Sequence, residues 1–491
     1  MRRLAGILLA VSSLPNRHGI GDFGPEAYKF VDLLEKSNVK IWQILPLNPL
    51  GFGNSPYQPY SSKAMDELYI SLDVLYKWGL LKEEVPSFRE SENSVNYDEV
   101  RAFKREYLEL AFKNFKRKIK LKEEFEAWCK ENPWANDFGI FMAFQKANDK
   151  ETWTNWPKEM KEYLNNRELD LTPYLEAIEI EKFIQFILFK QWNELKEYAN
   201  SKGIMIMGDV PFYVGLDSLD VWSDKDEFLL DENGIPTHVA GVPPDYFSAD
   251  GQRWGNPIYN WEKMKANNFK FWMERLGFAS KLYDIVRIDH FRAFDTYWKI
   301  PASCPTAVEG EWCQAPGYEI FDELYRNYPN INIVAEDLGD LFDSVLYLRD
   351  HYNLPGMNVL QFTFGIDKWE YGTKDRPNQL IYTGTHDNQT IKGYVDSLSE
   401  ENFYKLRNKL NRLNYYDEDI VRCFVNLALD NQSDYAIIPM QDILELGDEA
   451  KMNTPGTVGS PDWEWKLVNF DAFEEKIPWL ANRINETNRN N

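Results

Sequence analysis

Three acidic residues lie where apolar, strand-like runs end. Asp289, Glu336 and Asp387 each stand at, or shortly after, the C-terminal end of such a run. A buried carboxylate is costly unless it is paired or has a function. Two carboxylates on one rim can cleave a glycosidic bond, one attacking the anomeric carbon and the other protonating the departing oxygen. The pattern therefore indicates glycoside chemistry.

The neighbours of these acids suggest which one is ionised. Arg287 and Asp289 alternate along one predicted strand, so their side chains share a face. A guanidinium beside Asp289 favours its ionised form. Glu336 ends an apolar run with Asp337 next to it, and it is expected to be protonated. We therefore predict that Asp289 is the nucleophile and Glu336 the acid/base. A purely structural Arg287–Asp289 ion pair is the alternative.

Two of the five histidines, His290 and His386, adjoin the proposed carboxylates and could donate hydrogen bonds to sugar hydroxyls. A zinc site is the rival interpretation, but no H-E-x-x-H spacing occurs. The segment 19–24 matches G-x-G-x-x-G, yet it lies too far beyond the preceding strand for a dinucleotide turn. The acidic run 217–226 lacks a third properly spaced calcium ligand. We expect no metal and no cofactor.

Eight short apolar runs, separated by helical patterns, are typical of a (β/α)8 barrel. Long segments interrupt the alternation after the second, third and fourth strands. We expect one catalytic barrel domain over 1–491, with no separate C-terminal β-domain and with large, mainly helical insertions near 60–180, 211–261 and 294–320. The predicted strands are Ala5–Ala10, Ile41–Leu45, Ile204–Gly208, Asp284–Asp289, Asn332–Glu336, Gly356–Phe362, Leu380–Gly384 and Tyr435–Met440.

Composition narrows the class of protein. The 491 residues carry a formal net charge of −23, which disfavours nucleic-acid binding. No run reaches the ~18–20 apolar residues of a membrane span. We interpret the apolar run Leu4–Val11 as a strand and not as a signal peptide. The four scattered cysteines fit a reducing compartment, so we predict a cytoplasmic protein.

Several motifs together are similar to one family. They are NSPYQ at 54–58, GDVP at 208–211, PPDYF at 243–247, QRWGNP at 252–257, RIDH at 287–290, AEDLG at 335–339 and GTHDN at 384–388. The chain resembles the amylomaltases, which are 4-α-glucanotransferases of glycoside hydrolase family 77 in the α-amylase clan. The resemblance covers most of the chain.

The resemblance implies the same catalytic roles, with Asp289 as nucleophile, Glu336 as acid/base and Asp387 as transition-state stabiliser. It also implies a set of substrate-binding residues, namely Tyr57, Asp209, Asp245, Trp254, Arg287, His290 and His386. Phe52 and Ala293 depart from the residues common in the family. Tyr97 resembles a family aromatic at a remote glucan site, and with Phe52 it leaves a second glucan site open.

The activity implied is the transfer of an α-1,4-glucan segment, with retention, to the 4-hydroxyl of an acceptor sugar through a covalent glycosyl-enzyme. Maltooligosaccharides or other α-1,4-glucans would be donors, and glucose or maltooligosaccharides would be acceptors. An α-1,4-glucan hydrolase of the same clan is the alternative function. A non-catalytic glucan-binding protein is a second alternative, but it would not need three acids on one rim. The oligomeric state stays open.

Overall fold

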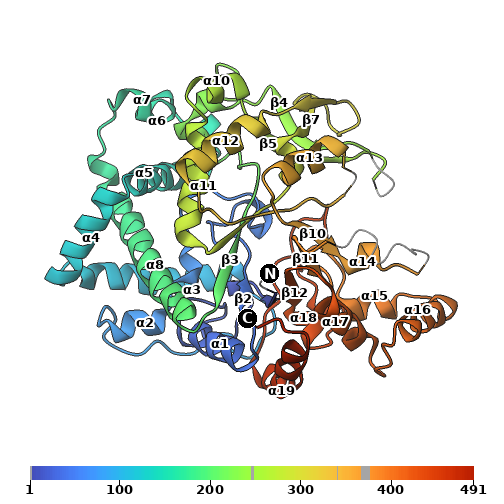
Figure 1. Ribbon diagram of the computed structural model, residues 1–491. Coiled ribbons are helices and arrows are strands. Elements are labelled where there is room, and N and C mark those ends of the chain that lie inside the picture. The colour runs from blue at the N-terminus through green and yellow to red at the C-terminus, as the bar shows by residue number, and fades with distance from the viewer. Residues whose placement is uncertain (1–2, 245–247, 340, 367–375, 491) are drawn as a thin grey trace.

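The computed structural model describes residues 3–244, 248–339, 341–366 and 376–490. Eight parallel strands form its central sheet, in the order β10-β11-β12-β1-β2-β3-β6-β9 (Figure 1). They are β1 (Leu4–Leu8), β2 (Ile41–Gln43), β3 (Met205–Val210), β6 (Ile285–Ile288), β9 (Ile333–Ala335), β10 (Gly356–Val359), β11 (Gln379–Tyr382) and β12 (Tyr435–Pro439). The eight predicted strands are confirmed.

Two hydrogen bonds join the edge strands of this sheet. The backbone N–H of Ala335, in β9, donates to the carbonyl of Pro355 just before β10, at 2.9 Å. The backbone N–H of Met357, in β10, donates to the carboxylate of Asp337 at 2.7 Å. A side chain thus completes the ring where backbone pairing is sparse, and the sheet approaches a closed (β/α)8 barrel.

Helices surround the sheet. The first of them begins at Pro25, whose fixed φ suits the first helical turn, and it buries Phe30, Val31 and Leu34 on one face. The helices that alternate with barrel strands are α1 (Pro25–Lys36), α8 (Leu175–Ser201), α11 (Lys270–Leu282), α12 (Gly317–Asn327), α13 (Asp343–His351), α15 (Ile391–Asp396), α16 (Glu400–Arg412), α17 (Ile420–Asp430) and α19 (Asp471–Glu486). None of the described helices is long and apolar enough to cross a bilayer.

Some predicted strands end earlier than expected. The run Gly356–Phe362 is strand only to Val359 and continues as the short helix α14 (Leu360–Thr363). A short apolar run does not distinguish a buried strand from a buried helical turn. At the end of β12, Pro439 has no N–H to donate, and α18 (Met440–Ile443) follows directly.

The long segment between β2 and β3 is helical, as predicted. Its helices are α2 (Leu72–Lys77), α3 (Tyr97–Phe115), α4 (Ile119–Glu131), α5 (Trp134–Ala147), α6 (Lys158–Lys161) and α7 (Tyr163–Asn166). Figure 1 shows them on one side of the barrel, beside α8. Phe144 of α5 contacts Trp156 and Trp222 edge-on, with ring centroids 5.9 and 6.1 Å away. Trp222 belongs to α9 (Leu219–Ser223), so these helices pack against the segment that follows β3.

The segments after β3 and β6 together build a second sheet, where mainly helical insertions near 211–261 and 294–320 were expected. Its four antiparallel strands run in the order β5-β4-β7-β8. They are β4 (His238–Val242), β5 (Gln252–Pro257), β7 (Thr296–Pro301) and β8 (Glu311–Gln314). The pairing of β4 with β7, for example Val239 opposite Ile300, joins the two segments. Helix α10 (Trp261–Ala266) then leads back to the barrel.

The two ends of the described chain meet at the amino ends of the barrel strands. Leu4, at the start of β1, forms a bridge with Asn490. Arg489 is fully buried, and its guanidinium donates to the carbonyls of Leu429 (2.6 Å) and Asn431 (2.5 Å). Parallel strands that start at this end all finish at the opposite rim, where the predicted acids lie.

Candidate active site

Arg287 lies at the centre of a charged cluster at the carboxyl end of the barrel. Its Nη1 contacts both carboxylate oxygens of Asp209, at 2.7 and 2.6 Å, and one oxygen of Asp289 at 3.2 Å. The first two side chains are buried, whereas the side chain of Asp289 is 28% exposed. Asp209 on β3 therefore makes the closer contacts with the guanidinium. The side chain of Asp289 stays accessible to a ligand.

Glu336 is linked to the chain next to Asp289 by a hydrogen bond from the backbone of His290. Its Oε2 accepts the N–H of His290 at 2.7 Å, and its Oε1 accepts the N–H of Leu338 at 3.1 Å. His290 follows Asp289 directly and has φ 54°, a left-handed conformation that turns the chain sharply after β6. Asp337 points away from the site and pairs with Arg349. The predicted opposition of the two neighbouring acids is therefore observed.

The loop after β11 presents Asp387 at the same rim. Oδ1 of Asp387 accepts the side-chain amide of Asn453 at 2.6 Å, and Oδ2 lies 3.3 Å from Nε2 of His386. Its side chain is 42% exposed. Asn453 also donates its backbone N–H to the carbonyl of His386 at 3.1 Å. The segment after β12 thus fixes the position of the loop after β11 through two hydrogen bonds from Asn453.

Aromatic side chains from the insertions line the cluster. The ring of Tyr57 stacks on His386, with centroids 5.2 Å apart and planes inclined by 12°, and its hydroxyl donates to Asp209 at 2.8 Å. Trp254, on β5, meets His290 edge-on at 4.9 Å. Gln58 donates its side-chain amide to the carbonyl of Trp254 at 3.2 Å, which links the two insertions above the barrel.

Burial is the main cause of the pKa shifts at this site. The pKa of Glu336 is raised, chiefly by burial, as expected; Arg287 and the two amide hydrogen bonds oppose the shift. The pKa of Asp289 is also raised, well above its usual value, because burial and the negative charges of Asp209 and Glu336 outweigh Arg287. The expected lowering of the Asp289 pKa by Arg287 is therefore outweighed in the free site, since Asp209 already takes up that guanidinium. Burial lowers the pKa of His290 to about 3, so its ring is neutral.

All predicted site residues within the described part of the chain come together at this rim. Asp245 lies outside the described residues. Asn453 was missed, because a single asparagine in a loop carries no periodicity or spacing signal. Two other sequence features are structural: Asp22, within the glycine-rich segment 19–24, pairs with buried Lys104 at 3.0 Å, and Asp217 accepts the N–H of Trp153 at 3.0 Å.

Tyr97, which resembles a family aromatic, and Ala293, one of the two departures, make no hydrogen bond or ion pair with the charged cluster. Tyr97 is buried, and its hydroxyl donates to the carbonyl of Trp463 at 2.6 Å. Ala293 is fully buried behind the site. Nothing is described of the side chain of Phe52. No group of three or more His, Cys, Asp or Glu side chains within the described ranges has the geometry to hold a metal ion.

Comparison with known proteins gives consistent matches. A family model described as 4-alpha-glucanotransferase matches residues 9–470. A 4-alpha-glucanotransferase of Synechocystis sp. is 42% identical, over 98% of this chain and 96% of that protein. The chloroplastic/amyloplastic 4-alpha-glucanotransferase of Solanum tuberosum is 40% identical, over 96% of this chain and 84% of that protein. A solved amylomaltase from Streptococcus agalactiae, in complex with acarbose, has a TM-score of 0.94 and 36% identity, with both chains fully covered.

Proposed function

Because the chain belongs to the 4-alpha-glucanotransferase family, we propose that its transfer of α-1,4-glucan segments proceeds with retention through a covalent intermediate on Asp289. Glu336 is the general acid and base, and Asp387 stabilises the transition state. The observation that carries this assignment is the hydrogen bond from the backbone of His290 to Glu336, since it places the second carboxyl beside the residue that follows Asp289.

The first half of the reaction breaks the donor's glycosidic bond. Glu336 gives its proton to the bridging oxygen while a carboxylate oxygen of Asp289 attacks the anomeric carbon. The bond from that carbon to the bridging oxygen breaks, and the reducing-end fragment leaves. Burial raises the pKa of Glu336, which favours the protonated form that this step needs. Asp289 must be ionised at this moment, and the positive charge that develops on the sugar ring favours its ionised form.

The second half reverses these roles. The 4-hydroxyl of an acceptor sugar gives its proton to Glu336 and bonds to the anomeric carbon, while Asp289 departs as a carboxylate. The hydrogen bond from Asn453 holds Asp387 in an orientation suited to accept hydrogen bonds from hydroxyls of the transferred ring. Its negative charge stabilises the positive charge that develops on that ring. Two inversions at one carbon give overall retention.

The neighbouring groups bind the sugar. The half-buried ring of Tyr57 supports the transferred ring, and His386 and His290 offer neutral imidazole donors to hydroxyls. Trp254 contributes from β5, and Asp245 is assigned to substrate binding by the family resemblance alone. Asp209 and Arg287 hold neighbouring side chains in place, through the hydrogen bond from Tyr57 to Asp209 and the contact between Arg287 and Asp289. In the related amylomaltase, the bound acarbose is itself a saccharide analogue, which agrees with a glucan ligand for this rim.

Product analysis distinguishes transfer from the alternative hydrolysis. Maltotriose as the only substrate is expected to give glucose and a ladder of longer maltooligosaccharides, with total reducing ends constant. A steady rise in total reducing ends would favour the hydrolase. An unchanged substrate would favour the non-catalytic binding protein.

Trapping tests the covalent intermediate. In a Glu336→Gln variant, α-maltosyl fluoride needs no acid to lose fluoride, so the first half-reaction proceeds while transfer to an acceptor is slow. Mass spectrometry of a protease digest is expected to find a maltosyl adduct on the peptide that contains Asp289. The double variant with Asp289→Asn is the control and should carry none. An adduct on another residue would refute the assignment.

We also infer a cytoplasmic location. The four cysteines are all free, which fits a reducing compartment. The measurement is fractionation of source cells, with the activity expected in the cytosolic fraction.

A further inference from the structure

The segment that carries Tyr57 is a loop closed at its base. The N–H of Tyr60 donates to the carbonyl of Pro49 at 3.1 Å, and the side-chain amide of Asn48 donates to the carbonyl of Ala64 at 2.9 Å. Between these contacts the chain leaves the barrel, reaches the rim and returns. Compact loops of this kind depend on their closing contacts for their shape.

Asp66 is the main polar side chain at this base. Its Oδ2 accepts the N–H of Leu50 at 2.9 Å, and its Oδ1 accepts the N–H of Leu68 at 2.9 Å. The side chain is 1% exposed. One carboxylate therefore joins the start of the loop to the chain that follows it, across a span of 16 residues.

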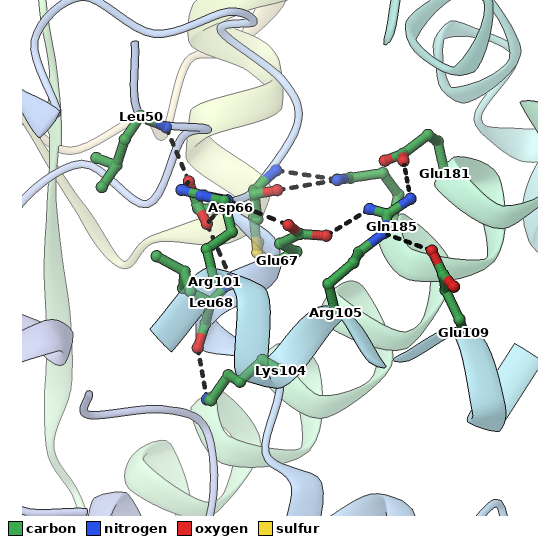
Figure 2. Close-up of polar contacts among 11 residues, drawn as sticks. Leu50, Asp66, Glu67, Leu68, Arg101, Lys104, Arg105, Glu109, Glu181 and Gln185 are labelled. Carbon is green, nitrogen blue, oxygen red and sulfur yellow. Dashed lines mark hydrogen bonds and ion pairs between the residues drawn. The ribbon is translucent and has the colours of Figure 1, made fainter. Parts of the chain in front are cut away.

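Arg101 of helix α3 neutralises Asp66. Its two terminal nitrogens contact the two carboxylate oxygens at 3.1 and 2.9 Å, in the paired geometry that is strongest for arginine and carboxylate (Figure 2). Gln185 of α8 docks the adjacent backbone by exchanging two hydrogen bonds with Met65, both at 2.9 Å. The insertion helix α3 thus contacts the base of the loop, and the loop contacts the site.

We propose that Asp66 and Arg101 form a positioning pair, which fixes the base of the loop so that Tyr57 meets His386 and Asp209. This inference rests on the proposed role of Tyr57 in sugar binding. Neither residue touches the charged cluster, so their effect on catalysis passes through Tyr57. If Asp66 lost its partner, a buried charge would be left uncompensated beside the N–H of Leu50, and the base would rearrange.

Arg105 provides a matched control on the same helix. It lies one turn further along α3 and contacts Glu67 and Glu181, both at 2.6 Å (Figure 2). It makes a comparable set of partly buried ion pairs, but it does not contact Asp66 or Leu50. A merely structural role for the network predicts similar consequences for the loss of either arginine.

A double-mutant cycle tests the pair. We compare Arg101→Gln and Arg105→Gln, each alone and combined with Tyr57→Ala, by kcat and KM for maltotriose at a temperature where every variant is folded. Arg101→Gln is expected to lower kcat/KM about tenfold, since small misplacements of a binding group have effects of this size. In the Tyr57→Ala background the same change should matter less than about twofold, because its target is gone. Arg105→Gln should stay within about twofold in both backgrounds.

Arg101→Lys keeps one positive charge but cannot hold both oxygens, so it should give an intermediate loss. This variant keeps the test available if Arg101→Gln does not fold. Equal effects of the two Arg→Gln changes, or the same Arg101→Gln effect with and without Tyr57, would overturn the positioning role. If the wild-type protein still converts maltotriose into glucose and longer maltooligosaccharides in that case, the proposed function stands and only this inference fails.

Discussion

Asp289 and Glu336 belong to one charged cluster with a guanidinium that Asp209 already occupies. The pKa of Asp289 is raised in the folded protein, and such a group stabilises the fold only below its unfolded pKa. That contribution is lost as the pH rises through the folded pKa. At neutral pH the ionisation of Asp289 therefore lowers the stability of the fold. The residue is retained because the reaction needs its carboxylate.

The substitution Asp289→Asn should remove this cost and abolish the attack. We expect kcat to fall about 10³-fold or more. We also expect the free energy of unfolding at pH 7 to rise, because the raised pKa of Asp289 makes its ionisation in the folded protein unfavourable. The gain should shrink as the pH falls toward about 4, because Asp289 then becomes protonated in the folded protein and its ionisation no longer costs free energy. Denaturant unfolding from pH 4 to pH 8 checks this, with the exposed Asp396→Asn as control; a variant less stable than wild type at pH 7 would contradict it.

The hydroxyl of Tyr57 can be tested apart from its ring. Tyr57→Phe keeps the stacking face and removes the hydrogen bond to Asp209. A hydrogen bond to a charged group contributes about 1.5–3 kcal/mol, so we expect kcat/KM for maltotriose to fall between about tenfold and a hundredfold. Tyr57→Ala should lose more, since it also removes the ring. Equal losses in the two variants would show that the ring contributes nothing.

At the scale of elements, the segment after β12 positions the loop after β11. Asn453→Ala removes the donor to Asp387 while leaving the backbone contact to His386. We expect kcat to fall about tenfold with little change in KM, because the orientation of Asp387 matters most in the transition state. Steady-state kinetics on maltotriose measures both constants. Asn453→Asp should be more damaging, since it adds a like charge beside Asp387; a milder effect than Asn453→Ala would refute this account.

How far the sequence predicts these elements depends on burial and on distance along the chain. The eight barrel strands are buried on both faces, so they are continuous apolar runs that can be recognised singly. The sheet that carries Trp254 was not predicted, because β4 pairs with β7 far along the chain and its residues are mixed in polarity. The direction of the Asp289 pKa shift was mispredicted because the partner that competes for Arg287, namely Asp209, comes from another strand.

At the scale of the whole molecule, the adjacent chain ends allow a circular permutation. Leu4 and Asn490 are bridged, and the loop between α16 and α17 exposes Tyr416 (67% exposed). A protein with its ends joined by a short Gly/Ser linker and reopened near Tyr416 should fold, with kcat/KM within about threefold of wild type. Reopening at Gly456 instead should reduce activity strongly, because that segment holds Asn453. Similar activity of the two permuted proteins would contradict this prediction.

The pairing of β4 with β7 has a consequence for building chimeras. The segment after β3 supplies β4 and β5, and the segment after β6 supplies β7 and β8, so neither forms its sheet alone. Exchanging only one of them for a homologous stretch would leave unmatched backbone edges and expose the small apolar cluster of Val239, Ile300 and Ala307. Grafts intended to alter acceptor choice should therefore transplant both stretches together, with their mutual register preserved.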